Sequence, residues 1–555
     1  MSKPPIPHLR WWIAGLLCLA SALNYLDRQT LSVLIGTIKD DLHLDNADYG
    51  AINAWFLASY GVMYAVSGLV IDRIGTRRGF TVFVSGWSLA NMLHVFAATV
   101  GQFSFFRCLL GVFEPGSFTG GVRAVSEWFP MRDRALAIGI FNAGTAFGSM
   151  LAAPIVSVIA VAFSWRAAFL VTGALGFVWV AGWWMLYKLP KDHPRISEEE
   201  RQLILSDQPQ DSRSERAVPL LEVLLVPQTW GCVLVRALTD PISYFLLFWI
   251  PLYFQQQHGF NLKQIGMFVW IPFAVAAIGN VFSGAMPRCL ISRGWELNSA
   301  RKLTMGLMTC LMLVFCVIVP QVSNPALALA IVAGMTFCHA GWGNIILPAE
   351  VFPKNAVGTV TGLGGALGSL IGALSQFYIG KVVDLYGFTP IFIACAGMYP
   401  LALLLVQLVI GKLGIVHTYL GNMRPVDVFF FFKGRVGRET LWCAWLSQIL
   451  MSIIATMLAT AGLFVLGIVQ EGWFHFVVLG IVWLILAGCA GVLTWIGVAI
   501  QVKRWHDLGF SGWMVLLNLV PVFGQVMSFC ALGFVKGTTG SNKYGSDPQK
   551  VGEVP

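Results

Sequence analysis

Long apolar segments recur along the chain, and they restrict the possible folds more than any other feature. The first six lie near 11–37, 49–71, 79–98, 102–124, 135–161 and 166–188. After a polar stretch, six more lie near 228–256, 262–291, 303–321, 325–348, 355–385 and 387–413. A bilayer core about 30 Å thick is crossed by a helix of roughly 20 apolar residues. The pattern therefore predicts an all-α integral membrane protein with two six-helix halves.

The amino-acid composition excludes the main alternatives. Only 11% of the 555 residues are charged, against about 25% in soluble domains, so the chain lacks the charges to cover a soluble surface. The cysteines form no C-x-x-C pair, and the sequence has no H-E-x-x-H motif, nucleophile elbow or phosphate-binding glycine loop. We therefore expect no metal, no cofactor and no enzymatic activity.

The basic residues predict the orientation of the helices. They gather in alternate short loops, which contain Arg73, Arg77, Arg78, Arg132, Arg134, Arg293, Arg301 and Lys302. By the positive-inside rule these loops face the cytoplasm, and the N-terminus then lies on the same side. The net charge of +9 follows in part from this topology, so we expect no nucleic-acid partner.

These features divide the chain into five parts. We predict an N-terminal six-helix half (1–188), a cytoplasmic central loop (189–227), a C-terminal six-helix half (228–413), a cytoplasmic linker (414–438) and a further membrane domain (439–555). The halves share a short internal repeat, because Glu127-Trp-Phe-Pro130 and Glu350-Val-Phe-Pro353 lie 223 positions apart, as Gly139 and Gly362 do. Parallel repeats of this kind build transporters whose site lies between the halves, near the bilayer midplane.

Four charged residues lie inside apolar segments of the N-terminal half. Asp27 and Arg28 are in the first segment, and Arg107 and Glu114 lie two helical turns apart on one face of the fourth. A charge at the centre of a membrane helix costs at least about 2.5–3.5 kcal/mol, so such residues usually face a cavity or each other. We expect all four to line one cavity. A structural set of ion pairs, or an Arg107 side chain that reaches the membrane surface, also fits the sequence.

The chemistry of these residues suits an acidic substrate. An arginine stays protonated, and its planar guanidinium grips a carboxylate through two hydrogen bonds. Asp27 stands beside Arg28 and should remain ionised, so Glu114 is the better candidate for a proton carrier. Three further polar residues either line the same cavity or serve packing and helix–helix hydrogen bonds: Tyr60, Asn142 and Thr145.

Several motifs resemble a known family. The stretch Gly68-Leu-Val-Ile-Asp-Arg-Ile-Gly-Thr-Arg-Arg78 is similar to the signature loop of the major facilitator superfamily. Four further motifs resemble the anion:cation symporter family within that superfamily: Asn24-Tyr-Leu-Asp-Arg28, Glu114, Glu127-Trp-Phe-Pro130 and Gly139-Ile-Phe-Asn142. Three motifs resemble the hexuronate and sugar-acid branch of that family: Trp165-Arg166, Thr172-Gly-Ala-Leu-Gly176 and His193-Pro-Arg195. The similarity extends over about 1–413, but the second signature loop, Gly284-Ala-Met-Pro-Arg288, lacks an acidic residue equivalent to Asp72.

The resemblance implies a twelve-helix major facilitator fold, and proton-coupled import of a hexuronate or related sugar acid by alternating access. The partners would be a small carboxylate substrate, protons and the lipid bilayer of a bacterial-type inner membrane, with no cofactor beyond the proton gradient. The family pattern puts substrate-binding residues at Arg28, Arg107, Tyr60, Trp342 and Asn344, and proton-coupling carboxylates at Asp27 and Glu114. It implies a cytoplasmic gating loop formed by Gly68, Asp72, Arg73, Gly75, Arg77 and Arg78.

A further membrane domain follows the second half. Apolar runs near 440–470, 473–500 and 511–535 predict about three helices, of which the last, interrupted by Pro521 and Gly524, is either one kinked helix or a re-entrant pair. Three stretches resemble the YhaH-like small membrane domain family: Phe432-Lys-Gly-Arg435-Val-Gly-Arg438, Arg504 to Trp513 and Asn542-Lys-Tyr-Gly545. The function of that family is unknown. His506-Asp507 suggests a proton relay, but an anchor at the membrane surface fits the motif better.

Two functions remain open at this point. The first is a proton-coupled sugar-acid transporter. The second is a membrane sensor that binds a sugar acid and signals through the C-terminal domain. Transport, as opposed to binding alone, discriminates between them.

Overall fold

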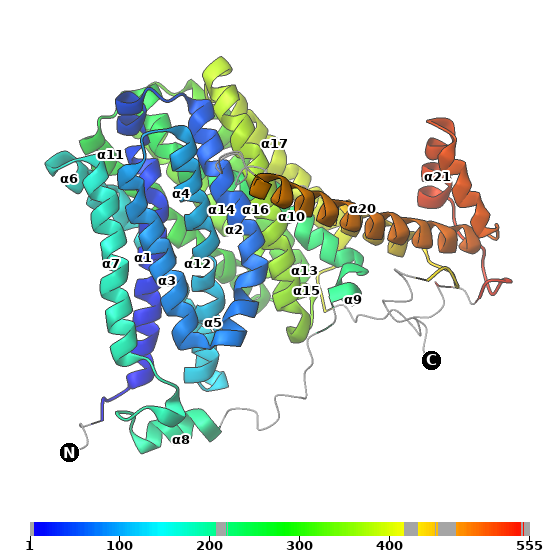
Figure 1. Cartoon of the computed structure of the whole chain (residues 1–555), viewed down its shortest axis with the longest axis horizontal. Coiled ribbons are helices and arrows are strands. Elements are labelled where there is room, and N and C mark those ends of the chain that lie inside the picture. The colour runs from blue at the N-terminus through cyan, green and yellow to red at the C-terminus, as the bar shows by residue number, and fades with distance from the viewer. Residues whose placement is uncertain are drawn as a thin grey trace. The chain divides into compact units, whose positions relative to one another are not determined.

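The computed structural model describes residues 5–206, 218, 220–415, 431–449, 451–452, 473–545 and 548 (Figure 1). Parts of the predicted central loop, the predicted linker and the first C-terminal apolar run lie outside these residues. The described residues are helical apart from loops and one isolated β-bridge, Asn542 to Gly545. The prediction of an all-α fold is therefore confirmed.

The chain divides into two compact units. The first contains the predicted N-terminal half and most of the predicted C-terminal half, and it comprises Met1–Glu215, Val233–Leu347 and Gly362–Gln407. The second comprises Arg216–Cys232, Pro348–Thr361 and Leu408–Pro555. The C-terminal domain thus belongs to one unit with two short segments from the centre of the chain.

The N-terminal half is a bundle of long helices. They are α1 (Leu9–Leu42), α2 (Asn46–Ile74), α3 (Thr76–Leu93), α4 (Val100–Phe113), α5 (Gly116–Trp128), α6 (Met131–Ala162) and α7 (Trp165–Leu186). In this bundle α1 packs against α6 and α7, α2 packs against α4, and α3 packs against α7 (Figure 1). Helices α1, α2 and α6 are longer than the apolar runs that predicted them, because their ends continue into polar sequence.

The fourth predicted span is interrupted. The sequence predicted one segment at 102–124, but α4 ends at Phe113 and α5 begins at Gly116. Glu114 and Pro115 form the break, since proline supplies no N–H and its ring crowds the preceding turn. A polar residue at a broken membrane helix is a common way to build a binding site near the midplane.

The C-terminal half repeats this arrangement. Its helices are α10 (Pro227–His258), α11 (Leu262–Phe268), α12 (Trp270–Ser292), α13 (Leu297–Ile318), α14 (Pro325–Trp342), α15 (Leu347–Val351), α16 (Lys354–Tyr386) and α17 (Thr389–Leu405). Here α12 and α13 pack against α14, and α13 also packs against α17. Across the chain, ten described helices are long and apolar enough to cross a membrane, and α2 is an eleventh, bent by 52° between Asn46–Tyr64 and Val66–Ile74.

The two halves are joined by polar contacts at the end of the bundle where α1 meets α2. The Asp384 carboxylate of α16 accepts the N–H groups of Asn46 and Ala47, at 3.2 and 2.9 Å, and so caps the N-terminus of α2. The Tyr49 hydroxyl donates to the Phe248 C=O at 2.7 Å. The structure is therefore closed at the α1–α2 end.

The described part of the central loop is attached to the N-terminal half. The Glu200 carboxylate of α8 (Glu198–Ser206) accepts the N–H groups of Leu9 and Arg10, and thereby caps α1. His193 is buried, and its ring packs edge-on against Trp128 with centroids 5.7 Å apart. Burial lowers the pKa of His193, which favours the neutral imidazole.

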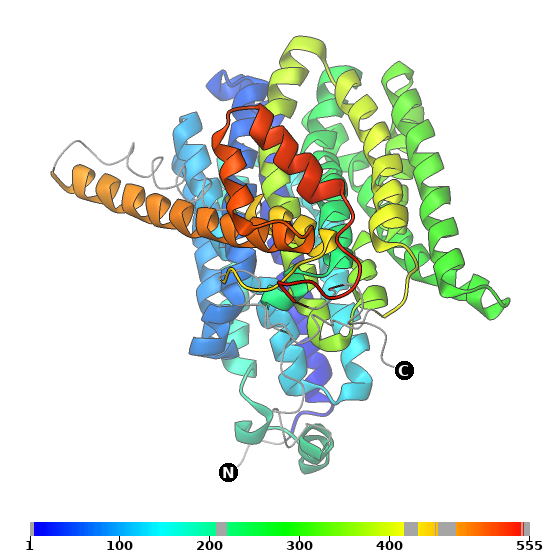
Figure 2. The same ribbon diagram turned by 90° about the vertical axis from the view of Figure 1, so that its right-hand side faces the viewer.

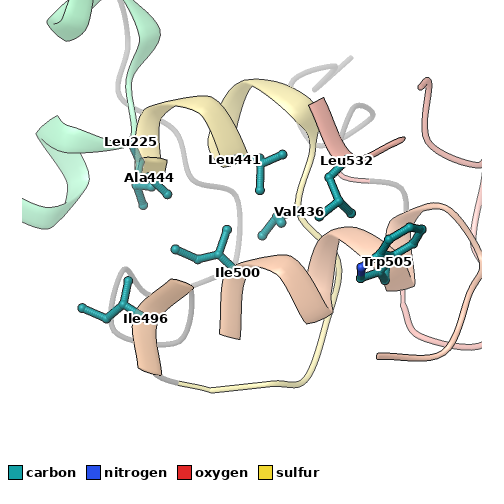
Figure 3. Close-up of a cluster of buried hydrophobic side chains, with 8 residues drawn as sticks. All are labelled: Leu225, Val436, Leu441, Ala444, Ile496, Ile500, Trp505 and Leu532. Atoms are coloured by element: carbon teal, nitrogen blue, oxygen red, sulfur yellow. The ribbon is translucent and has the colours of Figure 1, made fainter. Parts of the chain in front are cut away.

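The second unit has its own apolar core (Figure 3). It is formed by Leu225, Val436, Leu441, Ala444, Ile496, Ile500, Trp505 and Leu532. These residues come from the segment before α10, from residues 436–444, from α20 (Trp473–Asp507) and from α21 (Phe523–Phe534). Segments far apart in sequence are thus held together by a common hydrophobic contact.

The last apolar run is two short helices rather than one kinked helix. The 3₁₀-helix η6 (Gly512–Leu519) packs against α21 as a helical hairpin (Figure 2). At the turn, Val522 has a φ of 61°, and the Phe523 N–H donates to the Pro521 C=O at 2.7 Å. The two helices have 8 and 12 residues, and each is shorter than the roughly 20 residues needed to span a bilayer.

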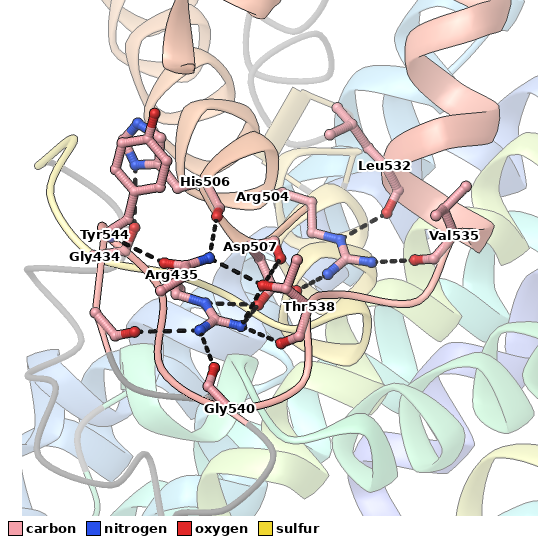
Figure 4. Close-up of polar contacts among 12 residues, drawn as sticks. Gly434, Arg435, Arg504, His506, Asp507, Leu532, Val535, Thr538, Gly540 and Tyr544 are labelled. Atoms are coloured by element: carbon pink, nitrogen blue, oxygen red, sulfur yellow. Dashed lines mark hydrogen bonds and ion pairs between the residues drawn. The ribbon is translucent and has the colours of Figure 1, made fainter. Parts of the chain in front are cut away.

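A buried ionic cluster ties the C-terminal motifs together (Figure 4). Arg435 and Arg504 both donate to the Asp507 carboxylate, with Arg435 Nη2 at 2.9 Å from Asp507 Oδ1. The remaining donors of Arg435 reach the C=O groups of Thr538 and Gly540, both at 2.6 Å. The motif residues that the sequence analysis singled out therefore hold three segments of the domain together.

His506 takes a different place from its neighbour Asp507. Its ring stacks on Tyr544 with centroids 3.9 Å apart, and its Nδ1–H donates to the Gly434 C=O at 3.2 Å. The two side chains are thus engaged with separate partners, which favours a structural role over a proton relay.

Asp507→Ala should destabilise this domain. Removing the carboxylate leaves two buried guanidinium groups without their counter-charge, and breaking a buried ion pair in this way costs about 3–5 kcal/mol. Limited trypsinolysis of the full chain in detergent should show faster cleavage between 431 and 545. His506→Phe is the matched control, because phenylalanine can still stack on Tyr544. Equal protease resistance in Asp507→Ala and wild type would contradict the structural role.

Candidate functional site

Arg28 and Glu114 form a buried ion pair in the N-terminal half. Arg28 lies on α1, and Glu114 lies in the break between α4 and α5. The Arg28 Nε–H donates to Glu114 Oε2 at 2.8 Å, and Arg28 Nη2 lies 2.6 Å from the same oxygen. The side-chain exposures are 3% and 0%, so water hardly screens the pair. Neutralising Glu114 would remove the charge that holds the Arg28 guanidinium.

Arg107 lies on α4 beside this pair and has unused hydrogen-bonding capacity. Its Nη2–H donates to the Arg28 C=O at 2.9 Å. Its Nε and Nη1 have no hydrogen-bond partner among the residues that the structure describes. The side chain is fully buried, so it does not reach out to the membrane surface. Two free donors on a buried guanidinium are the groups that grip a carboxylate.

Asp27 contacts amide and hydroxyl groups rather than Arg28. Its Oδ1 accepts from Asn91 Nδ2 at 2.8 Å, and the same Asn91 nitrogen lies 2.8 Å from Thr172 Oγ1. Arg28 contacts Glu114 instead of Asp27, because consecutive helical residues point in different directions. Oδ2 of Asp27 and Oε1 of Glu114 have no hydrogen-bond partner in the described part of the chain, so each carboxylate keeps an oxygen that could accept a proton.

Aromatic rings surround the Arg28 guanidinium. Its Cζ atom lies 4.5 Å from the Tyr25 ring centroid, 4.8 Å from that of Tyr60 and 5.3 Å from that of Phe56. Tyr60 therefore lies next to the predicted binding arginine. Cation–π contacts of this kind stabilise an arginine in a position where water is excluded.

Three predicted site residues contact residues other than Arg28 and Arg107: Asn142, Thr145 and Trp342. Asn142 is exposed, and its C=O accepts from the Thr145 hydroxyl at 2.8 Å. Trp342 is fully buried in the C-terminal half, where its Nε1–H donates to the Thr309 hydroxyl at 3.0 Å. In this conformation Trp342 therefore packs among α13, α14 and α17.

A second buried ion pair, which sequence reasoning missed, lies in the C-terminal half. Arg236 and Asp240 are one helical turn apart on α10, with Arg236 Nη2 at 2.8 Å from Asp240 Oδ2. Asn344 donates to Asp240 Oδ1 at 3.1 Å and to the Thr239 hydroxyl at 2.7 Å. The predicted residue Asn344 thus belongs to a polar group of the C-terminal half. Two charges four residues apart inside an apolar run were the signal that could have found it.

The predicted gating loop is organised by α5. Asp72 forms an ion pair with Arg123, which also lies 3.2 Å from Glu127 Oε1. Glu127 accepts from the hydroxyls of Thr76 and Tyr187. Arg123 was not predicted, although its spacing of four from Glu127 could have indicated it.

The other loop residues have distinct environments. Gly75 separates α2 from α3 with a φ of 81°, in the region that favours glycine. The Arg77 Nη2–H donates to the Trp184 C=O at 2.6 Å. Arg73 and Arg78 are exposed, and a Cβ atom added at Gly68 would lie 3.9 Å from Thr119. The loop is therefore fixed mainly by contacts within its own half.

The arrangement can bind an anion and exchange a proton. Arg107 supplies free donors, and the Arg28–Glu114 pair can open when Glu114 is neutralised. Both the donors and the carboxylates are buried, so an ion that enters this region interacts with them strongly.

Two family models and several known proteins match this chain. The family model of the Major Facilitator Superfamily matches residues 17–376, and that of a protein of unknown function (DUF805) matches residues 429–546. The hexuronate transporter of Escherichia coli (strain K12) is 33% identical over 429 residues, which cover 76% of this chain and 96% of that protein. The galacturonate transporter of Dickeya chrysanthemi is 37% identical over 312 residues, or 56% and 90% of the two chains.

A solved structure supports the same fold. It is that of a bacterial homologue of the human lysosomal transporter Spinster, in an inward-facing and unoccupied conformation. The TM-score is 0.57 at 17% identity, and the match covers 73% of this chain and 96% of that one. The relatives are transporters and not enzymes, as the sequence predicted. This chain, with its two six-helix halves and its C-terminal domain from a second family, belongs to the Major Facilitator Superfamily.

Proposed function

We propose that this protein imports a hexuronate, or a closely related sugar acid, together with a proton. The observation that carries the proposal is Arg107, a fully buried guanidinium whose Nε and Nη1 have no hydrogen-bond partner among the described residues. A substrate carboxylate would accept from one of these donors and from the neighbouring Nη2, which has a second hydrogen. The 33% identity to a hexuronate transporter supports this class of substrate.

The position of Glu114 supports proton coupling. While it is ionised, Glu114 occupies the Arg28 guanidinium at 2.6–2.8 Å. A proton on Glu114 cancels this attraction, and Arg28 can then turn to the same substrate carboxylate as Arg107. Proton binding therefore favours anion binding, and each favours the other to the same degree. Asp27, with its unpartnered Oδ2, is a second candidate proton carrier.

The direction of transport follows from the predicted topology. With a cytoplasmic N-terminus in a bacterial inner membrane, the closed α1–α2 end faces the outside and the gating loop faces the cytoplasm. The Asp384 cap on α2 would then be broken and remade once in each transport cycle. The proton gradient supplies the energy, and no cofactor is required.

Uptake into proteoliposomes tests the proposal. Radiolabelled galacturonate and glucuronate should accumulate when the outside is more acidic than the inside, and accumulation should collapse when a protonophore is added. Absence of uptake across a panel of sugar acids would contradict the proposal. Binding without uptake would instead favour the sensor, an alternative that the transporter relatives do not favour.

A further inference from the structure

The helical hairpin of the C-terminal domain lies in an uncharged stretch of sequence. Residues 508–535 contain no Asp, Glu, Lys, Arg or His. Arg504 lies just before this stretch, and Lys536 and Lys543 lie after it. An uncharged segment bounded by basic residues is typical of a part of the chain that lies in lipid.

Apolar side chains are exposed along the whole hairpin. Trp513 and Leu519 of η6 are both 77% exposed, and Phe534 at the end of α21 is 61% exposed. At the turn between the helices, Val522 and Phe523 are 73% and 74% exposed. A helix that docks on a protein usually has one apolar stripe and a polar opposite face. Here the helices and the turn are all apolar on the outside, so the surroundings that suit the hairpin are lipid rather than water.

Polar groups of the hairpin are bonded within the protein. The Asn518 Nδ2–H donates to Gln501 Oε1 of α20 at 2.6 Å, and the Gln525 side chain donates to the Asn518 C=O at 3.5 Å. At the turn the Phe523 N–H donates to the C=O of Pro521, which itself has no N–H. In hydrocarbon the backbone polar groups have to be bonded inside the protein, so this turn is compatible with lipid around it.

Both ends of the hairpin return to the ionic cluster (Figure 4). The Arg504 Nε–H donates to the Leu532 C=O near the end of α21, at 3.0 Å. The Thr538 N–H donates to the Asp507 C=O before η6, at 2.9 Å. The chain therefore enters and leaves the hairpin on the same side, as a re-entrant segment does.

The length of the hairpin matches one leaflet of a bilayer. Its helices have 8 and 12 residues. With the rise per residue of 3₁₀- and α-helices, they are about 16 Å and about 18 Å long. The hydrocarbon core is about 30 Å thick, so one leaflet contributes about 15 Å. A hairpin with the ionic cluster among the headgroups would thus place its turn near the midplane.

We propose that the hairpin of η6 and α21 inserts into the cytoplasmic leaflet as a re-entrant segment, in contact with phospholipid acyl chains. The ionic cluster then lies at the level of the headgroups. The exposed lysines around the base, Lys433, Lys536 and Lys543, place this base on the cytoplasmic side by the positive-inside rule. The hairpin fastens the C-terminal domain to one leaflet, whatever substrate the transporter carries.

Fluorescence quenching in the full-length protein tests the depth of the turn. A small fluorescent amino acid replaces either Phe523 at the turn or the exposed Thr539 near the ionic cluster. Each protein is reconstituted with lipids that are brominated near the ends of their acyl chains. These lipids should quench the label at 523 at least about twofold more than the label at 539, because only the turn approaches the midplane. Iodide in the water should quench the label at 539 and not the label at 523.

The side of the membrane is tested with the label at 539. Iodide added outside inside-out membrane vesicles should quench it, and iodide added outside right-side-out vesicles should not. Quenching in right-side-out vesicles alone would overturn the cytoplasmic placement.

Two results at the turn would overturn the insertion itself. Strong quenching of the label at 523 by iodide would mean that the turn lies in water. Apolar emission from that label without quenching by the brominated lipids would mean that protein covers the turn, either other helices of this chain or a second copy. Monodisperse elution in detergent establishes the folding of each labelled protein. Leu519, which is equally exposed near the turn, gives a second position for the label if replacement of Phe523 disturbs folding.

Discussion

Arg107→Ala should weaken hexuronate binding by at least about 100-fold, because each hydrogen bond to a charged group contributes about 1.5–3 kcal/mol. Arg107 is fully buried, and two of its nitrogen atoms have no hydrogen-bond partner among the described residues. Neither donor is available in alanine, and the substrate carboxylate would enter a buried region with less compensating charge. Equilibrium binding of labelled galacturonate to purified protein measures the effect.

Two further variants serve as controls for Arg107→Ala. Arg107→Lys keeps the charge but loses the planar pair of donors, so its affinity should lie between those of wild type and Arg107→Ala. Arg166→Ala removes an exposed arginine that lies 3.3 Å from Asp41, and it should bind normally. A thermal unfolding curve shows whether Arg107→Ala is folded. Wild-type affinity in folded Arg107→Ala would show that the substrate carboxylate binds elsewhere.

Glu114→Gln should abolish the accumulation of substrate against a gradient but leave the exchange of substrate across the membrane. Glutamine cannot carry a proton, and it no longer holds Arg28 by charge, so binding and exchange of substrate across the membrane should continue. A transporter that moves one proton with each substrate can accumulate about tenfold for each pH unit of gradient. The variant should fall to a ratio of about 1, as expected for an uncoupled carrier.

Counterflow and gradient-driven uptake in the same proteoliposomes measure the two activities. Glu199→Gln is the control, because Glu199 is an exposed carboxylate in α8. It should retain both activities. If Glu114→Gln still accumulates substrate against a pH gradient, Glu114 is not the required proton carrier and the role passes to another carboxylate, of which Asp27 is the nearest candidate.

Most helices of the first unit were predictable from hydrophobicity alone. In lipid the backbone must satisfy its own hydrogen bonds, so an apolar run of sufficient length has to be a helix. The break at Glu114–Pro115 was not predicted, because the apolar pattern of 102–124 continues through it. The tight turn at Val522 was also not predicted in detail, since Pro521 and Gly524 indicated an interruption of the apolar run but not the geometry of the turn.

The residues of the candidate site were more predictable from the sequence than the contacts between them. The high energetic penalty of charges in membrane helices singled out Arg28, Arg107 and Glu114, and the structure brings them together. Which arginine holds Glu114 depends on how α1 and α4 rotate against each other, and one sequence does not contain that information. Asp27 shows the same limit, because its partner Asn91 comes from α3.

The C-terminal half was predicted less well. Arg236 and Asp240 lie in the run 228–256 and gave the same signal as the charges of the first half, yet the family pattern drew attention to Trp342 and Asn344 instead. The structure joins Asn344 to Asp240 and packs Trp342 against Thr309. A search for charges in every apolar run, independent of resemblance, would have found the pair.

Proton-coupled import is tested most directly by measuring whether protons enter with the substrate. Proteoliposomes containing a trapped pH-sensitive dye, with no gradient imposed, are mixed with galacturonate. We predict that the interior acidifies as galacturonate enters and that protein-free liposomes do not respond. Glu114→Gln vesicles preloaded with unlabelled galacturonate should exchange it for labelled galacturonate without acidification. Entry of galacturonate into wild-type vesicles with no change in internal pH would contradict proton-coupled import.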